Sequence, residues 1–516
     1  MREVSGGRLV AGLRDSQVKL ELTPEELQRV HAHSLLAGLT VGEPVTKTLH
    51  SIYFDTPDGR LRGAGLSLHI RADGTTWVQT VKSECPKANG LDQPAELVVN
   101  QAEPDLGAID DVKLQRKLAR LTHGSVLEPA FETMVKRTTH HLRTETGDLE
   151  LTFDEGVVRS GAAEKPICEA ELELKSGSAA DLLQTAAKLF ADEPVRLAKA
   201  STAERGYDLI FGRSDASPQP QSAQPVVVRK GATCRDALTL FVESASRQIL
   251  ANRRAVLETD DPEGVHQLRI GLRRLRSALY AFRPLIDVHS TREMDRHAKA
   301  VARAVGALRD ADMFIDDIYA PAAGSMKGHP GLRPLKQALQ AHRALKRGAA
   351  RSELQGKHWS ALQLYLALWP QTIVECQALD RPVAKFGRAA LGACWRKALK
   401  KGKHLAKLEG EQRHKMRKTL KTVRYTAEFF GSLYDAGDVQ PFVKQLKRLQ
   451  DLFGYINDVE TAVELESICD RYARDSREGQ RAAGYALGWH TARAAVSWGR
   501  AEKRWHGLQA TGRFWR

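Results

Sequence analysis

The chain has 516 residues and a formal net charge of +15, so it is long enough for two or more domains and strongly basic. The charge is unevenly divided: residues 1–225 carry 26 Lys and Arg against 33 Asp and Glu, whereas residues 226–516 carry 52 against 30. We therefore expect the second part to meet a polyanion, and charge excludes the first part as a nucleic-acid binder.

Apolar runs and cysteines restrict the class of protein further. No stretch approaches 18 consecutive apolar residues, and residues 1–17 mix charges and glycines without an apolar core. These features argue against a membrane span and a signal peptide. The six cysteines lie far apart without a Cys-x-x-Cys pair, which indicates reduced, buried thiols and no zinc framework. We expect a cytoplasmic protein that does not contact membranes.

The first 210 residues alternate predicted strands with amphipathic helices. Polar and apolar residues alternate over 15–22, 66–71, 76–82, 148–154 and 169–175, and the turn Asp73-Gly74 makes the second and third of these a hairpin. Helical patterns cover about 24–37, 110–121 and 179–191. At residue 23, Thr-Pro-Glu-Glu predicts a helix start with a capping box.

The alternation leaves two arrangements open. If the helices cover the apolar strand faces, the charged faces line a tunnel in a closed antiparallel barrel; otherwise an open sheet exposes its charged face to water. The mixed charge of that face favours the tunnel. Carboxylates two residues apart on a strand converge on hard cations, and neighbouring Lys and Arg would grip a phosphate that the metal bridges.

Several motifs carry a resemblance to a known family. Tyr53-Phe-Asp-Thr-Pro57, the stretch 61–71, Trp77-Val-Gln-Thr-Val-Lys82, the stretch 168–177 and the stretch 200–207 resemble the CYTH domain of the triphosphate tunnel metalloenzymes over about 15–210. The resemblance implies an eight-stranded tunnel that binds a triphosphate through basic residues and hydrolyses it with Mg²⁺ or Mn²⁺. The implied triphosphate-binding residues are Lys19, Arg71, Lys82, Lys136, Arg137, Lys199 and Arg205. The implied metal ligands are Asp15, Glu150, Asp154, Glu169, Glu171 and Glu173.

One motif departs from the family pattern. The family opens with Glu-x-Glu-x-Lys, whereas this chain has Asp15-Ser-Gln17-Val-Lys19. The first carboxylate is shortened and the second is replaced by an amide, so we expect weaker metal binding. His69 also stands where family members carry an Arg. Catalytic competence is therefore left open.

Residues 213–230 are rich in Pro, Ser and Gln without apolar periodicity, which is typical of a flexible linker. We therefore place an N-terminal domain at 1–212, a linker at 213–230 and a helical domain at 231–516.

The helical domain contains a basic ridge twice. At about 100° per residue, His266, Arg269, Arg273 and Arg276 fall within an arc of roughly 80° on a helix. The spacing returns 148 positions later at His414, Arg417, Lys421 and Arg424. Forty residues after each His comes a Gly-x-(Leu/Ile)-(Arg/Asn)-Asp-x-(Asp/Glu) turn. This repetition indicates a tandem duplication, and it favours a polyanion receptor over a merely solvated charged face.

A basic ridge followed by an acidic turn resembles the CHAD domain, over about 226–510. The resemblance implies a duplicated α-helical bundle that binds inorganic polyphosphate without a cofactor. The candidate polyphosphate-binding residues are His266, Arg269, Arg273, Arg274, Arg276, Arg309, His414, Arg417, Lys418, Lys421 and Arg424. We expect Asp310, Asp312, Asp458 and Glu460 to orient the arginines.

The sequence thus predicts a multidomain chain: an antiparallel β-barrel tunnel with helices packed outside (α+β), followed by an all-α, tandemly duplicated helical bundle. The predicted function is polyphosphate binding joined to hydrolysis of tripolyphosphate or a related triphosphate. A non-catalytic adaptor of polyphosphate granules, with a degenerate tunnel, is the alternative. Nucleic acid is disfavoured as a partner, although Trp505 and Trp515 leave a stacking platform open.

Overall fold

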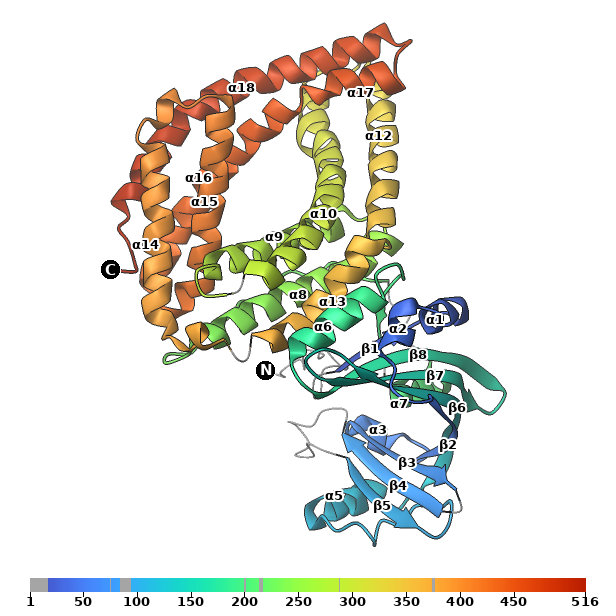
Figure 1. Cartoon of the computed structure of the whole chain (residues 1–516). Coiled ribbons are helices and arrows are strands. Elements are labelled where there is room, and N and C mark those ends of the chain that lie inside the picture. Colours follow the sequence, from blue (N-terminus) through green and yellow to red (C-terminus); the bar gives the residue numbers. More distant parts are fainter. Residues whose placement is uncertain are drawn as a thin grey trace. The chain divides into compact units, whose positions relative to one another are not determined.

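A computed structural model describes residues 17–74, 76–83, 94–198, 201–212, 217–286, 288–373 and 376–516 (Figure 1). The chain divides into two compact units. We call Met1–Ala216 with Gln363–Thr372 the sheet unit, and Ser217–Leu362 with Ile373–Arg516 the helical unit. The predicted succession of a sheet-rich region and an all-helical region is confirmed. Asp15, Cys85, Lys199 and residues 213–216 lie outside the described residues.

The sheet unit contains one antiparallel sheet in the order β5-β4-β3-β2-β6-β7-β8-β1-β9. The described strands are β1 (Gln17–Glu21), β2 (Val45–Asp55), β3 (Leu66–Asp73), β4 (Thr76–Ser83), β5 (Ala95–Val99), β6 (Glu128–Arg143), β7 (Asp148–Ser160), β8 (Ala163–Ser176) and β9 (Arg196–Leu197). All the predicted strands are present, and β3 and β4 form the hairpin around Asp73-Gly74.

The described helices of the sheet unit are α1 (Pro24–His31), α2 (Ser34–Leu39), α3 (Arg60–Gly63), α5 (Val112–Thr122), α6 (Ala179–Leu189) and α7 (Thr202–Phe211). The three helical segments predicted there are present as α1 with α2, as α5 and as α6, and α3 and α7 are additional helices. The capping box predicted at Thr23 and Glu26 starts α1. Leu114 and Leu118 of α5 pack against Leu68, Ile70 and Val81. The helices thus cover apolar strand faces, as the tunnel interpretation required.

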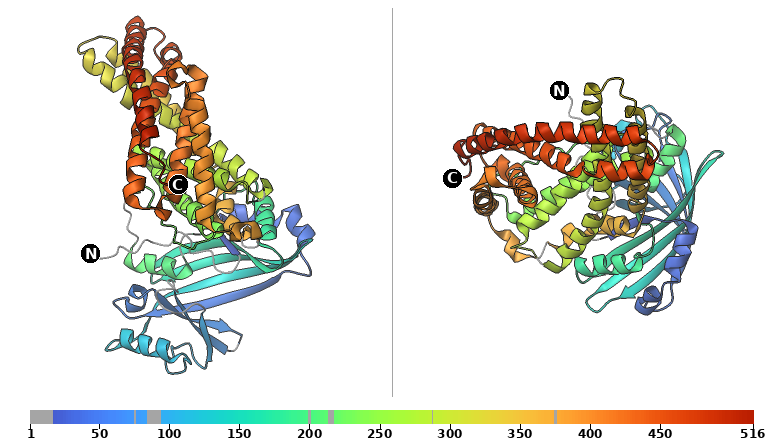
Figure 2. Two further views of the ribbon diagram at one scale, coloured as in Figure 1. Left: turned by 90° about the vertical axis from the view of Figure 1, so that its left-hand side faces the viewer. Right: turned by 90° about the horizontal axis from the view of Figure 1, so that it is seen from above.

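The sheet differs from the expected closed, eight-stranded barrel. Among the described residues nine strands pair, and β5 and β9 each have a single neighbour, so they remain edges. A two-residue strand such as β9 offers too short an edge for a continuous ladder. The long strands nevertheless curl strongly (Figures 1 and 2). The polar faces turn toward one another without closure of the ladder.

Helix α7 packs against this sheet through a glycine. Ala203 and Tyr207 of α7 share an apolar cluster with Phe131, Val135 and Ile167. A Cβ at Gly206 would lie 2.2 Å from the ring of Phe131, so only glycine permits this approach. The close approach places the next residue toward the N-terminus, Arg205, over the polar face of the sheet.

From residue 234 to residue 510 the described chain is largely helical. The helices are α8 (Cys234–Glu258), α9 (Pro262–Phe282), α10 (Val288–Met313), η1 (Phe314–Tyr319), α11 (Ala320–Ser325), α12 (Leu332–Glu353), α13 (Lys357–Thr372), η2 (Gln377–Asp380), α14 (Val383–Gly402), η3 (Leu405–Lys407), α15 (Gly410–Phe430), η4 (Gly431–Leu433), α16 (Ala436–Thr461), α17 (Glu464–Tyr472) and α18 (Arg477–Ala510).

Helix boundaries confirm the duplication that the sequence predicts. α9 begins at 262 and α15 at 410, 148 positions later, and each has 21 residues. α10 begins at 288 and α16 at 436, again 148 positions apart, and each has 26 residues. α8 pairs with α9 and α10 with α9, as α14 pairs with α15 and α16 with α15 (Figure 1).

The basic helices are held by their apolar sides. Asp261 caps α9 by accepting from Glu263 N, and Pro262 occupies its first turn. Leu268, Leu272 and Leu275 of α9 are fully buried. Burial of such a side chain stabilises a fold by about 1.5–3 kcal/mol, so this stripe fixes which side of α9 remains free for its basic residues.

The end of the predicted linker lies on the helical unit. Residues 217–230 form no helix or strand, but the backbone N–H of Gln221 donates to Oδ1 of Asn252 at 2.9 Å. Nδ2 of Asn252 donates back to the Gln221 carbonyl at 2.8 Å, and Val228 N donates to Ser432 Oγ at 2.9 Å. Val228 is buried. We call residues 217–230 the strap. The predicted boundaries 212/213 and 230/231 remain predictions.

Two expectations about the chain's class can be compared with the structure. None of the helices in the described part combines the length and apolar character that crossing a bilayer requires. The five described cysteines are free thiols, but only Cys234 and Cys469 are buried, while the other three are half-buried.

Gly206→Ala tests whether the glycine positions α7. The added methyl group overlaps the ring of Phe131, so we expect destabilisation by about 1–3 kcal/mol and faster amide hydrogen exchange in α7 and β6. Gly38→Ala in α2 is the control, because nothing lies within 4 Å of the position that its added methyl group would take. Equal exchange in both variants would contradict the prediction.

Candidate functional site

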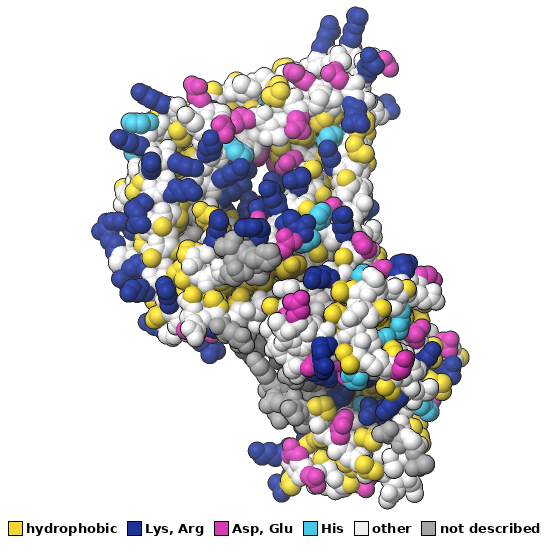
Figure 3. Space-filling model, in the orientation of Figure 1, with side chains coloured by type: hydrophobic (Ala, Val, Ile, Leu, Met, Phe, Trp, Pro, Cys, Tyr) yellow, Lys and Arg dark blue, Asp and Glu magenta, His cyan; other side chains and the backbone are white. Residues whose placement is uncertain are grey.

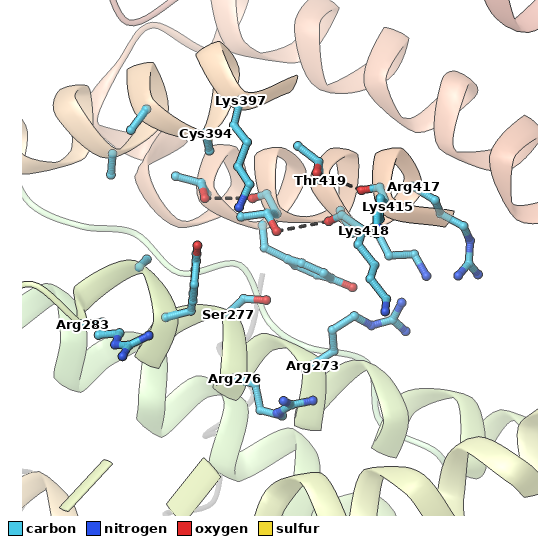
Figure 4. A pocket seen from close by; sticks show the side chains of 18 of the residues that line it. Arg273, Arg276, Ser277, Arg283, Cys394, Lys397, Lys415, Arg417, Lys418 and Thr419 are labelled. Atoms are coloured by element: carbon cyan, nitrogen blue, oxygen red, sulfur yellow. Dashed lines mark hydrogen bonds between the residues drawn. The ribbon is translucent and has the colours of Figure 1, made fainter. Parts of the chain in front are cut away.

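A cavity of about 1450 Å³ opens between α9, α14 and α15 of the helical unit (Figure 4). Its lining is cationic, and none of the described Asp and Glu residues belongs to it. The Lys and Arg side chains that line it number eleven: Arg269, Arg273, Arg276, Arg283, Lys299, Lys397, Lys401, Lys415, Arg417, Lys418 and Lys421. We call this cavity the basic pocket. In Figure 3, Lys and Arg side chains gather around the hollow of the helical unit.

α9 supplies the first predicted ridge to the basic pocket. Arg269, Arg273 and Arg276 line it, as helical spacing predicted. Figure 4 shows Arg273 extending from α9 toward α15, whereas Nε of Arg276 donates to Oδ1 of Asp295 at 2.7 Å. His266 is half-buried beside Arg309, and neither residue is in the lining.

Arg274 corrects one of the sequence predictions. Its guanidinium donates to Gln248 Oε1 and to Ser244 Oγ, both at 3.2 Å, on α8. It is buried, with 8% of its surface exposed, and does not line the basic pocket. On a helix it lies about 120° from the middle of the ridge, so it faces the neighbouring helix and ties α9 to α8.

α15 supplies the second ridge. His414, Arg417, Lys418 and Lys421 line the basic pocket. Nδ1 of His414 lies 3.1 Å from Oδ1 of Asn457, which fixes the ring. Arg424, although predicted to take part, turns away: its Nε donates to Glu428 at 2.6 Å and its Nη1 to Gln450 Oε1 at 3.3 Å. Its position is outside the lining.

The pocket keeps like charges close together. Burial, and after it the charges of Arg273, Arg417 and Arg269, lowers the pKa of Lys421 from 10.5 to about 6. The pKa values of Arg273 and Arg417 are also lowered, in both cases chiefly by burial. Nε of Arg417 is buried without a hydrogen-bond acceptor among the described residues. An anion in the pocket would supply the missing acceptors.

The acidic turns lie beside the pocket and act on only some of its arginines. Arg269 donates to Oδ1 of Asp310 at 2.9 Å, and Asp458 lies close enough to Arg417 to influence its charge. Burial raises the pKa of Asp458, so this carboxylate is an imperfect counter-ion. The expected orienting role is thus observed for Asp310.

The other two carboxylates of the turns engage different partners. Asp312 accepts from Arg343 at 2.6 Å, and Glu460 lies 3.8 Å from Arg413. Neither arginine belongs to the predicted ridges or to the pocket lining.

Sequence reasoning missed part of the pocket. Lys397 and Lys401 of α14, with Arg283 and Lys299, line it without belonging to either ridge. The signal available was the i, i+4 spacing of the two lysines on a predicted helix, which any solvated face also shows. The suggested stacking platform is absent from the end of the described chain, because Trp505 and Trp515 are buried.

The sheet unit contains a second cluster of predicted residues on its polar face. The ladder pairs place Lys19 opposite Glu171, and Glu21 opposite Glu169. Lys19 Nζ lies 2.5 Å from Glu169, and Arg205 of α7 reaches both Glu169 and Glu21. Glu169 is almost fully buried, at 2% exposure. The structure therefore brings Lys19, Arg205 and Glu169 together.

Ladder register shows which of two adjacent basic residues shares this face. Arg137 lies opposite Asp154, which lies opposite Glu169, and it donates to both Asp154 oxygens at 2.7 Å. Lys136 pairs with Glu155 instead, so its side chain lies on the opposite face. The structure therefore corrects the prediction for Lys136, which does not share this face with the other residues predicted to bind the triphosphate.

Curling of the sheet brings distant strands within electrostatic reach. Lys82 of β4 remains exposed, yet partial desolvation lowers its pKa, and Arg71 and Lys19 lower it further while Glu96 and Glu171 raise it. Five strands separate β4 from β1 in the sheet order, so the sheet must curl for these charges to meet. His69 is buried against Tyr53, and desolvation, then Lys82 and Arg71, lower its pKa to about 3. It therefore adds no positive charge.

The carboxylates of this face are ligands that suit a hard cation, but most of them are paired with Lys or Arg. Glu150 and Glu173 share Lys175, at 3.2 and 2.9 Å, while Asp154 binds Arg137 and Glu169 binds two cations. Among the described residues no group of three or more His, Cys, Asp and Glu side chains could hold a metal ion. Four of the predicted ligands are paired with Lys or Arg, so Mg²⁺ or Mn²⁺ would have to compete with these internal cations for the carboxylates.

Models of two protein families match the chain, one in the sheet unit and one mainly in the helical unit. The family model of the CYTH domain matches residues 17–207, and that of the CHAD domain matches residues 241–466. Both resemblances proposed from the sequence motifs are thereby confirmed.

Individual proteins are also similar to parts of the chain. An inorganic triphosphatase of Haemophilus influenzae is 28% identical over 195 residues, which are 38% of this chain and 54% of that protein. The chain thus spans about half the length of this curated relative. The crystal structure of the CHAD domain from the plant Ricinus communis matches with a TM-score of 0.50 and 26% identity, over 57% of this chain and 98% of that one.

The lowered pKa of Lys421 leads to a prediction about pH. With a pKa of about 6, Lys421 is neutral above that pH in the free protein, and a bound polyanion restores its charge. Binding should therefore take up a proton between about pH 6 and pH 10, and affinity should rise as pH falls through this window. Calorimetry at pH 8 in buffers of different ionisation enthalpy measures the uptake.

Lys421→Met should reduce this proton uptake, while Lys336→Met, on the exposed part of α12, should leave it unchanged. Uptake that persists undiminished in Lys421→Met would show that Lys421 is already charged in the free protein.

Proposed function

The chain carries a CYTH domain followed by a CHAD domain, and on that basis we propose that it binds inorganic polyphosphate in the basic pocket of its helical unit. We further propose that its sheet unit binds and hydrolyses tripolyphosphate or a related triphosphate. The observation that carries the first proposal is a pocket lined by eleven Lys and Arg side chains and by no described carboxylate.

Polyphosphate supplies what the pocket lacks. Its phosphates repeat along one chain, so they can meet α9 and α15 in succession, whereas isolated anions would meet one helix at a time. Arg273 and Arg417 offer donor forks, and Lys421 offers a compact charge. Each phosphate also separates cations that repel one another in the free protein, so binding removes a cost already present in the fold. No metal is needed for this binding.

Selectivity for polyphosphate over nucleic acid follows from the enclosure of these groups. Partial burial at Arg273, Arg417 and Lys421 favours a slender chain that can enter the pocket, and a base-bearing strand would place its bulk there as well. Single-stranded DNA should therefore displace labelled polyphosphate poorly at equal phosphate concentration. Association with polyphosphate granules in the cytoplasm stays a prediction.

The proposed triphosphate site lies on the polar face of the sheet unit. The similarity of the chain to an inorganic triphosphatase over 195 residues supports it. So does the convergence of Lys19, Arg71 and Lys82 across the curled sheet. Triphosphate oxygens would compete with Glu169 for Lys19 and Arg205, and this exchange would release a carboxylate from its two cations. Hydrolysis with Mg²⁺ or Mn²⁺ is the activity we propose for this site.

A specific observation favours a second candidate function for the sheet unit. Gln17 occupies the ladder position opposite Glu173, where a second charged carboxylate is missing. Glu150, Asp154 and Glu169 are paired with Lys or Arg. Such a face could bind a triphosphate without turning it over. The chain would then be a polyphosphate adaptor without catalytic activity.

Gln17→Glu separates these two candidates. It adds a carboxylate opposite Glu173 and next to the ladder pair of Lys19 and Glu171. Phosphate release from tripolyphosphate with Mg²⁺ or Mn²⁺ should therefore increase by about tenfold or more. Release of inorganic phosphate by the full chain is the measurement. Gln28→Glu, at an exposed position of α1, makes the same chemical change elsewhere and should have no effect. No gain in a folded Gln17→Glu protein would place position 17 outside the reaction.

Reversing single charges in the pocket tests polyphosphate binding. Arg273→Glu and Lys421→Glu should each weaken binding of long-chain polyphosphate by at least about tenfold, because each places an anion beside the bound chain. Displacement of a fluorescent polyphosphate measures the affinity.

The same variants should retain their resistance to unfolding, since neither residue forms an ion pair among the described residues and each introduced carboxylate lies beside arginines. Lys336→Glu on α12 changes net charge equally outside the pocket and is the control. Equal loss of binding in all three variants would show that only bulk charge matters.

A further inference from the structure

One side of the basic pocket carries a group of four lysines outside the two ridges. Lys397 and Lys401 come from α14, and Lys415 and Lys418 come from α15. We call these four residues the lysine annex. Figure 4 shows Lys397 and Lys418 extending from their helices toward the space that Arg273 enters.

The annex concentrates charge that the protein hardly neutralises. Lys401 has a lowered pKa, first because of desolvation and then because Lys397, Lys415 and Lys418 lie close to it. Its ammonium group reaches the Lys415 carbonyl at 3.4 Å. Only Lys415 has a carboxylate partner among the described residues, Glu411 at 2.9 Å, and that pair is exposed.

The duplication does not repeat the annex. The positions 148 residues earlier are Ile249, Arg253, Gln267 and Ile270. Ile249 is fully buried, Gln267 bonds to Gln248 at 2.8 Å, and Arg253 donates to the Leu354 carbonyl at 3.0 Å. The first repeat thus uses these positions for packing, and the second repeat presents lysines there. This asymmetry gives the pocket one extended cationic end.

We infer that the lysine annex is a second phosphate subsite, which receives the part of a polyphosphate chain that extends beyond the two ridges. The inference rests on the proposed polyphosphate function of the same pocket. Lysine suits such a subsite because its compact charge on a flexible stem follows a mobile chain, whereas arginine forks fix particular oxygens. A chain held at the ridges reaches the annex at high effective concentration. The pocket therefore selects long chains over short ones.

The test compares two ligands on the full chain with a chelator present, so that a metal-dependent triphosphate site does not contribute. Lys397→Gln/Lys401→Gln should weaken binding of long-chain polyphosphate by at least about fivefold, and should weaken binding of tripolyphosphate at the ridges by less than about twofold. The dependence of log affinity on log salt should become shallower by about 1.4 for the long chain, since two phosphate contacts are lost.

Lys385→Gln/Lys400→Gln is the matched control, because both residues are exposed on α14 and neither lines the pocket. This variant should bind both ligands as the unaltered protein does. Equal losses for the control, or equal losses for long and short ligands in the annex variant, would overturn the inference. Failure of the unaltered protein to bind long-chain polyphosphate would instead overturn the proposed function itself.

Discussion

The helical unit depends on holding three cations close together that form no ion pair among the described residues. Arg273, Arg417 and Lys421 face one cavity, and repulsion and desolvation there lower the pKa of Lys421 to about 6. Nothing within the described lining of the pocket offsets this cost. The cost is offset on the opposite side of α9, where its leucines are buried and Arg274 donates a hydrogen bond to α8. The buried side of each helix therefore determines how much charge the open side can concentrate.

The sheet unit handles a similar set of charged residues in the opposite way. Its polar face alternates the two signs, so Arg137 binds Asp154, Lys19 binds Glu169, and Lys175 joins two glutamates. A ligand of this face must first compete with internal partners. A ligand of the basic pocket meets cations such as Arg273 and Lys421, which have no carboxylate partner among the described residues. We therefore expect a phosphate ligand of the sheet unit to bind by displacing internal carboxylates. A phosphate ligand of the basic pocket should bind by direct attraction to its cations.

Local periodicity was sufficient where a functional residue and its partners lie on one helix or strand. Spacing identified most of the basic lining residues of α9 and α15, although His266 and Arg424 lie outside the pocket, and the repeat identified the equivalence of the two helices. Spacing could not identify Lys397 and Lys401, because they join the pocket only through the packing of α14 beside α15. Adjacent positions were likewise ambiguous. Arg274 and Lys136 lie one residue from a site residue, and only the neighbouring helix or the ladder register shows that they face elsewhere.

The strap determines where a fragment that contains the helical unit should begin. Its composition suggests a spacer, yet Gln221 exchanges two hydrogen bonds with Asn252, and Val228 is buried. A fragment cut at residue 231 would leave Asn252, itself fully buried, without these partners. A fragment that starts at residue 217 would retain them. The strap is therefore part of the helical unit. A recombination that transfers this unit intact to another protein must include the strap, although its sequence resembles a dispensable linker.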